Sequence, residues 1–136
     1  MNKISKKANL ENLSLLLDFV KESSERAGFN GDTISEIVLA SEEILVNIIN
    51  YAYGDKKGPV DVICQPCEKK GICVTFIDSG APFNSLAASS PDLSLPLKDR
   101  KVGGLGICLV KNLMNEVRYD RNDGKNVLTI VKSLEG

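Results

Sequence analysis

The sequence predicts an α+β fold, a two-layer sandwich in which helices pack on one face of a mixed, mostly antiparallel sheet. Apolar residues recur at helical spacing in two stretches before residue 53. Most of the predicted strands come later, and short polar turns join them in pairs. Helices that cluster in the sequence, followed by hairpin-connected strands, favour a sheet covered by helices on one side.

Two helices are expected in the first half of the chain. The first spans about 10–27 and follows Asn9, and Gly28 stands where a helix commonly ends in a left-handed residue. The second is predicted to begin at the capping box Thr33 to Glu36 and to run to about residue 52. Its apolar residues cover most of its circumference, which indicates burial on several sides.

The remaining elements are strands and one more helix. Residues 1–8 read as a frayed edge strand, and strands are predicted at 60–65, 71–78, 117–121 and 126–133. Asp123-Gly124 is a hairpin signal between the last two strands. A helix is expected over 105–117. The segment before it, 79–106, is rich in Ser, Pro and Gly, and its length indicates a functional loop within a single domain of 136 residues.

Composition excludes several classes of function. The formal net charge is −1 and no basic block stands out, so we expect no direct contact with nucleic acid. The apolar runs are too short to span a bilayer, which leads us to expect a cytoplasmic protein without membrane contact. Because the chain has no histidine, triads and metal sites that need histidine are excluded.

The chain has four cysteines, and Cys64 and Cys67 have the spacing of zinc knuckles and thioredoxin-like motifs. The motif does not open a helix and no second pair completes a zinc site. We interpret the cysteines as structural and reduced, with a metal or redox protein as the least favoured alternative.

Polar side chains interrupt the apolar second helix. Glu43 and Asn47 are four residues apart and therefore share a helix face, which Asn50 extends by one turn. Such a strip is either solvent-exposed or lines a cleft, because burial of unpaired polar groups is costly.

Two further motifs lie around the long loop. Asp78 ends an apolar strand and Gly80 follows, where a side chain would block a flat ligand; an ordinary turn is the alternative. Gly103, Gly104 and Gly106 precede a helix, so that backbone N–H groups could face an anion. The alternative is that these glycines only make the segment before the helix flexible.

Taken together, the order Glu-x3-Asn, Asp-x-Gly-x-Pro, long loop and Gly-Gly-Leu-Gly resembles the GHKL ATPase superfamily. The small size and the stretch "GGLGICLVKNLMNEVRY" resemble the bacterial anti-sigma-factor serine/threonine kinases. The resemblance implies a Bergerat-type fold and a site for ATP or ADP with Mg²⁺. It also implies an ATP lid over about 80–105.

The resemblance also implies roles for individual residues. Glu43 would be the general base, Asn47 the Mg²⁺ ligand and Asp78 the carboxylate that accepts from the amino group of adenine. Gly80 would leave room for the ring, and Thr129 would lie under it from the last strand. The other expected nucleotide contacts are Asn50, Pro82, Gly103, Gly104, Leu105 and Gly106.

Two functions follow from this resemblance. The first is an anti-sigma-type kinase that phosphorylates a serine or threonine of an antagonist protein and sequesters a sigma factor or similar partner. The second is a nucleotide-dependent protein-binding module without transfer activity. Relatives of this kind are often homodimers, and an apolar face on the first helix could serve such a contact.

Overall fold

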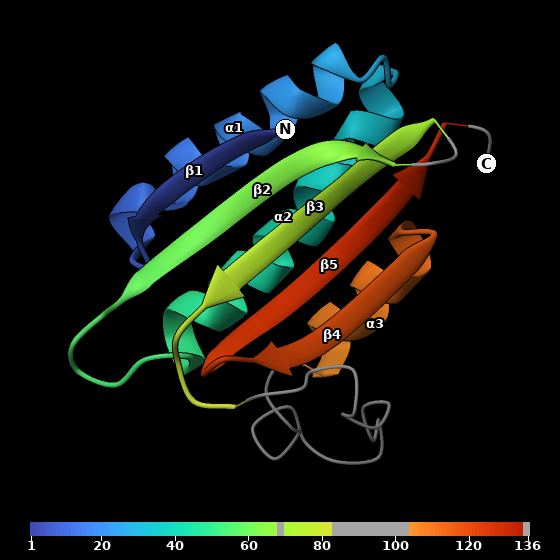
Figure 1. Cartoon of the computed structure of the whole chain (residues 1–136). Coiled ribbons are helices and arrows are strands. Elements are labelled where there is room, and N and C mark those ends of the chain that lie inside the picture. The colour runs from blue at the N-terminus through green and yellow to red at the C-terminus, as the bar shows by residue number, and fades with distance from the viewer. Residues whose placement is uncertain (68–69, 83–103, 135–136) are drawn as a thin grey trace.

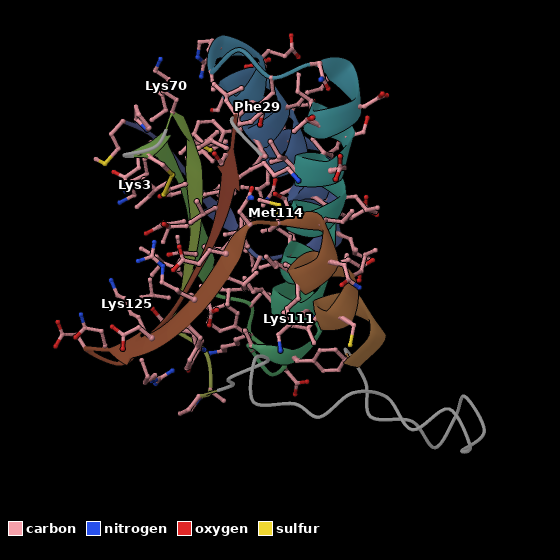
Figure 2. The ribbon with its side chains drawn as sticks, turned by 90° about the vertical axis from the view of Figure 1, so that its right-hand side faces the viewer. Lys3, Phe29, Lys70, Lys111, Met114 and Lys125 are labelled. Carbon is pink, nitrogen blue, oxygen red and sulfur yellow. A yellow bond between two sulfur atoms is a disulfide. The ribbon has the colours of Figure 1, made fainter. Side chains whose placement is uncertain are left out.

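One five-stranded sheet carries all the helices on one of its faces (Figure 1). The structure, a computed structural model, describes residues 1–67, 70–82 and 104–134. The side view in Figure 2 shows the same two layers. The predicted α+β class is confirmed. In chain order the elements are β1 (Asn2–Lys7), the 3-10 turn η1 (Leu10–Asn12), α1 (Leu13–Arg26), α2 (Gly31–Tyr51), β2 (Pro59–Cys67), β3 (Gly71–Asp78), α3 (Gly104–Leu113), β4 (Glu116–Asn122) and β5 (Lys125–Ser133).

The strands lie in the order β1-β2-β3-β5-β4, and each neighbouring pair is antiparallel. The expected mixed sheet is therefore wrong for the described strands. The pairing of β3 with β5 places Asp78 opposite Asn126 at one end of the sheet. This register joins two residues that are far apart in the sequence.

The core lies between the helices and the covered sheet face. Alternate residues of β3 turn to opposite faces: Val74 and Phe76 are buried under the helices, whereas Thr75 between them is only half-buried. The second helix, α2, is buried over much of its length, as its sequence predicts. Its core residues are Ile37, Ala40, Ile44, Leu45, Ile48 and Ile49.

Helix ends differ in part from expectation. The predicted capping box at Thr33 is wrong, because Asn30 is the N-cap of α2 and its side-chain oxygen accepts a hydrogen bond of 2.8 Å from the backbone N–H of Thr33. Gly28 adopts the left-handed conformation with φ of 95°. The third helix ends at Leu113 rather than at residue 117. The apolar period continues past its end because Met114 and Val117 also pack on the core.

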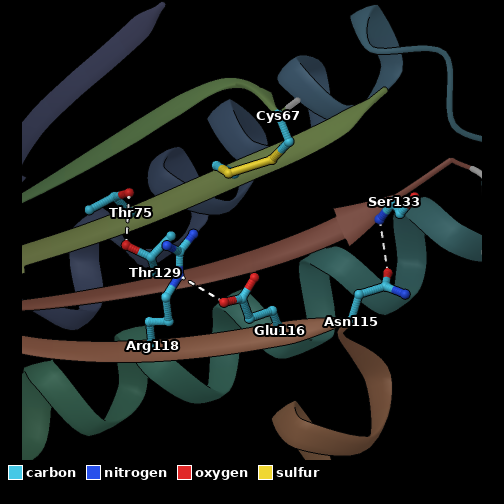
Figure 3. The surroundings of a disulfide bond; sticks show 8 residues. Cys67, Thr75, Asn115, Glu116, Arg118, Thr129 and Ser133 are labelled. Carbon is cyan, nitrogen blue, oxygen red and sulfur yellow. Dashed lines mark hydrogen bonds and ion pairs between the residues drawn. A yellow bond between two sulfur atoms is a disulfide. The ribbon is translucent and has the colours of Figure 1, made fainter. Parts of the chain in front are cut away.

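Cys67 and Cys73 form a disulfide across the β2–β3 hairpin (Figure 3). The expectation that all four cysteines are reduced is therefore wrong, and Cys67 is not paired with Cys64 as a C-x-x-C unit. Cys64 is buried on the helix side of β2, and Cys108 is half-buried on α3. The described residues contain no group of acidic, histidine or cysteine side chains that could hold a metal ion.

The two free cysteines should react at different rates. Burial raises the pKa of the Cys64 thiol, against the opposing effects of the Ser23 hydrogen bond and the Arg26 charge. Iodoacetamide reacts with the thiolate and needs access to it, so we expect Cys108 to be alkylated well before Cys64. Mass spectrometry of timed, quenched samples measures both rates. In denaturant the two rates should converge; faster labelling of Cys64 in the native protein would contradict its burial.

Among the helices that the structure describes, none combines the length and apolar character needed to cross a membrane.

Candidate active site

A cavity lies between α2, α3 and the end of the sheet where Asp78 meets Asn126. Its volume is about 40 Å³, room for a few water molecules, so a nucleobase enters only if the surrounding side chains move apart. The wall is largely apolar, with a few polar groups that converge on it, which is typical of small-molecule sites. The lining residues are Ile44, Asn47, Ile48, Ala52, Asp78, Ile107, Val110, Tyr119, Asn126 and Leu128.

The second helix supplies the polar pair expected from the sequence. Asn47 is half-buried and lines the cavity. Glu43 lies one helical turn away and is also half-buried. Its carboxylate lies against the first turn of α3, since a methyl group added to Gly106 would come within 2.5 Å of Oε2 of Glu43. Asn50 is exposed and does not line the cavity, so the structure does not support its predicted contact with nucleotide.

Asp78 ends β3 inside the cavity and is only 5% exposed. Its Oδ1 accepts hydrogen bonds from the backbone N–H of Gly80 at 2.9 Å and from Nδ2 of Asn126 at 3.0 Å. Both hydrogen bonds that the described residues donate to this carboxylate reach the same oxygen. Oδ2 is therefore the oxygen that can accept a hydrogen bond from a ligand.

Gly80 lies where a side chain would collide with the end of α2. A Cβ at this position would lie 2.1 Å from the backbone oxygen of Ala52, at the end of α2. The adjacent N–H of Ala81 donates to that same oxygen at 3.0 Å. The absent side chain lets the chain after Asp78 approach α2, and the expected role of leaving room for the ring stays a prediction.

We expect Gly80→Ala to lower the free energy of unfolding by about 1–3 kcal/mol, because the methyl group overlaps backbone atoms that cannot turn aside. Gly31→Ala is the matched control, since nothing lies within 4 Å of a Cβ there. Chemical denaturation of both variants measures the difference. Equal stability of the two variants would contradict the contact between Gly80 and Ala52.

Tyr53 connects the end of α2 to the strands that hold Asp78. Its hydroxyl donates to the backbone oxygen of Pro59 at 2.6 Å and accepts from the N–H of Ser79 at 2.8 Å. Burial raises the pKa of Tyr53, the hydrogen bond from Ser79 opposes that rise, and the charge of Asp78 adds to it. The phenol therefore stays neutral and can keep donating to Pro59.

Thr129 lies on the other side of the sheet. Its hydroxyl is 3.2 Å from that of Thr75 on the face that the helices leave open (Figure 3). Leu128 and Asn126, which alternate with it along β5, are the residues of this strand that reach the cavity. The expectation that Thr129 lies under an adenine ring is therefore corrected.

The expected lid falls largely outside the described residues, and so does Gly103. Pro82 is exposed and does not line the cavity, so the structure does not support the nucleotide contact expected of it. Gly104 and Leu105 begin α3, and Gly106 follows beside Glu43. The N-terminal end of a helix favours anions through its free N–H groups and its dipole. The start of α3 is thus suited to hold phosphate.

Sequence reasoning did not identify Asn126, Tyr119 or Arg121 as residues of the site. Asn126 and Tyr119 line the cavity from β5 and β4, and Arg121 donates to the backbone oxygen of Gly80 at 2.9 Å. Their only signal was a position near the Asp-Gly hairpin. The strand register that brings them to Asp78 cannot be read from that hairpin alone.

The donor set fits a nucleotide with Mg²⁺. The carboxylate residue Asp78 and the amide residue Asn47 line the same cavity, and no carboxylate cluster is present among the described residues. Mg²⁺ commonly takes few protein oxygens and completes its shell with phosphate oxygens and water. Asn47 is therefore suited to be its protein ligand.

The chain is similar to several known proteins. A family model described as a histidine kinase-like ATPase domain matches residues 7–132. The serine/threonine-protein kinase BtrW of Bordetella bronchiseptica is 29% identical over 94 residues, which are 69% of this chain and 66% of BtrW. The serine-protein kinase RsbW of Bacillus mycoides is 26% identical over 109 residues, 77% of this chain and 68% of RsbW. The chain thus spans about two thirds of the length of these relatives.

Solved structures show the same fold. The RsbU and RsbW domains of a Mycobacterium tuberculosis protein match with a TM-score of 0.67 at 16% identity, over 98% of this chain and 32% of that one. A histidine kinase domain from Erythrobacter litoralis, from a blue-light activated kinase, matches with a TM-score of 0.54 at 16% identity, over 90% of this chain and 65% of that one.

Proposed function

Since the chain belongs to the histidine kinase-like ATPase domain family, we propose that it is an ATP-dependent protein serine/threonine kinase of the anti-sigma type. One observation carries the proposal: Asp78 and Asn47 line one cavity, and Glu43 lies one turn from Asn47 beside the start of α3. The site would then contain Asp78 to bind adenine, Asn47 to bind the metal ion and Glu43 as the general base.

Different residues would bind the adenine, the metal ion and the phosphates of ATP. Oδ2 of Asp78 would accept a hydrogen bond from the amino group of adenine, and the apolar wall would contact the ring. Asn47 would hold Mg²⁺, which when bound neutralises charge on the phosphate oxygens. The first N–H groups of α3, from Gly104 onward, would donate to the phosphates.

Glu43 would act on the acceptor side. As the serine or threonine oxygen bonds to the γ-phosphorus, the bond from that phosphorus to the β,γ-bridging oxygen breaks and ADP leaves. The carboxylate of Glu43 takes the hydroxyl proton. Phosphoryl transfer depends mainly on positioning and charge neutralisation, so this small set of groups can support it without histidine.

The metal role is tested with two asparagines of α2. We expect Asn47→Ala to remove most of the gain in ATP affinity that Mg²⁺ gives, because the amide oxygen is its protein ligand. Asn50→Ala, on the exposed part of the same helix, is the matched control and should bind like the wild type. Titration calorimetry with Mg²⁺ or with EDTA measures the gain; the same gain in Asn47→Ala as in the wild type would contradict the assignment.

Transfer activity is tested with γ-labelled ATP and a purified antagonist protein of the anti-anti-sigma class. Labelled phosphoserine or phosphothreonine is expected in the antagonist. ATP-dependent binding of that protein without labelling would instead indicate a binding module without kinase activity. BtrW and RsbW are named as kinases, which favours transfer.

The partners would be proteins rather than nucleic acid, with a sigma factor or an equivalent regulator bound when the antagonist is phosphorylated. A protein kinase that uses ATP would act in the cytoplasm. Leu10 on η1 and Leu15 on α1 are 67% and 51% exposed, and these leucines support the expected homodimer contact on the first helical segment. Sedimentation of Leu15→Lys against the wild type tests that contact, since a dimer held there would dissociate.

A further inference from the structure

The side chain of Asn126 is hydrogen-bonded to four of the described residues around the nucleotide cavity. It lies on β5 opposite Asp78 and is 6% exposed. Its Nδ2 donates to Oδ1 of Asp78 at 3.0 Å and to the backbone oxygen of Ala81 at 2.8 Å. Its Oδ1 accepts from the hydroxyl of Tyr119 at 2.5 Å and from the guanidinium of Arg121 at 3.2 Å.

These partners fix the orientation of the amide. The oxygens of Asp78 and Ala81 can only accept and the guanidinium of Arg121 can only donate, so a flipped amide would lose these three hydrogen bonds. Because both hydrogens of Nδ2 are used within the protein, Asn126 is not expected to donate to a base itself. Its effect on a ligand must pass through Asp78.

We propose that Asn126 is a positioning residue that holds Asp78 as a hydrogen-bond acceptor, with Oδ2 toward the ligand. Asn126 would thereby favour purines with an amino group over purines with a carbonyl group at the ring position that faces Asp78. The proposal rests on the proposed function, in which Asp78 reads adenine. Nδ2 of Asn126 and the N–H of Gly80 both donate to Oδ1, which fixes the orientation of the carboxylate. Oδ2 can then accept a hydrogen bond from an amino group, whereas a carbonyl oxygen would bring a second acceptor against it.

Asn126→Asp tests this with almost no change in shape. The new oxygen would replace Nδ2 and face Oδ1 of Asp78 and the oxygen of Ala81, so all three atoms would be acceptors. Two carboxylates this close tend to share one proton. Protonation at low pH would restore a donor toward Asp78 and recreate the hydrogen bond of the wild type.

Other ionisable groups near this pair come from β4 and from the end of α2. Arg121 and Tyr119 face residue 126 from β4, and Tyr53 reaches the chain beside Asp78 through Ser79. Guanidinium and phenol groups ordinarily titrate well above the pH range of this experiment. The third helix contributes only apolar side chains to this cavity among its described residues. A change in binding with pH in the variant should therefore report the carboxylate pair.

The experiment compares ATP and inosine triphosphate binding by calorimetry in the wild type, Asn126→Asp and Asn122→Asp. Asn122 is exposed at the end of β4, so Asn122→Asp adds the same charge without touching Asp78. For Asn126→Asp we expect ATP affinity to fall by about tenfold or more near pH 8, as expected when a hydrogen bond to a charged group is lost. The affinity should recover toward pH 5.5 or so as the pair takes up a proton. The preference for ATP over inosine triphosphate should shrink at neutral pH, whereas Asn122→Asp should match the wild type throughout.

A wild-type affinity and an unchanged ATP preference in Asn126→Asp across this pH range would overturn the proposal. If Asn126→Asp does not fold, Tyr119→Phe serves instead: it removes one donor to Asn126 and should weaken ATP binding severalfold, and no effect would again contradict the role. A folded wild type that binds no ATP would instead overturn the proposed function, so the two failures are distinguishable.

Discussion

Asp78→Asn should reduce ATP affinity by about 100-fold or more, the largest effect that we expect from any single substitution. The backbone N–H of Gly80 and Nδ2 of Asn126 both donate to Oδ1, so the new amide should keep its oxygen there. Its NH₂ group would then replace Oδ2 and face the amino group of adenine. A donor would oppose a donor in a site that is only 5% exposed to solvent at this residue.

Calorimetry of Asp78→Asn measures this loss. The ratio of the affinity for inosine triphosphate to the affinity for ATP should be higher in this variant than in the wild type. Asp120→Asn is the control, because Asp120 is exposed on β4 and its substitution removes the same charge. Near-wild-type ATP affinity in Asp78→Asn would show that this carboxylate does not read the base.

Glu43→Gln should leave ATP affinity within about threefold of the wild type but lower the rate of phosphotransfer by about 10²–10⁴-fold, the usual contribution of a general base. The amide has nearly the same shape, so its contact with Gly106 at the start of α3 can be kept. It cannot take the proton of the attacking hydroxyl.

The exposed neighbour Glu42 offers the control, since Glu42→Gln makes the same change one residue away on α2. Single-turnover transfer from labelled ATP to the antagonist protein separates chemistry from binding. Undiminished transfer by Glu43→Gln would remove Glu43 from the mechanism and leave only its packing against α3.

Much of the fold follows from local patterns. Helical periodicity and strand alternation locate the three described helices and the four strands after residue 58, although the predicted first helix begins with the 3-10 turn η1. Asp123-Gly124 forms the predicted hairpin, with φ of 51° and 75°. Element ends were less predictable. Asn30 and Thr33 both begin plausible caps, and the core residues Met114 and Val117 extend a helical period beyond the end of α3.

The site was predictable where a residue's face depends on its own helix or strand. Glu43 and Asn47 share a face of α2, and Asp78 ends a strand, as their spacing indicates. Thr129 was misplaced because a shift of one residue along a strand reverses its face. Asn126 was missed because its role depends on the pairing of β3 with β5. The Cys67–Cys73 bond likewise depends on a hairpin register.

The central claim is that this cavity binds ATP with Mg²⁺. Titration calorimetry of ATP into the wild-type protein, with Mg²⁺ and with EDTA, tests it most directly. We expect one ATP per chain and tighter binding when Mg²⁺ is present. The absence of binding heat at several temperatures, in protein shown to be folded by circular dichroism, would contradict the account and leave Asp78, Asn47 and Glu43 as parts of the scaffold alone.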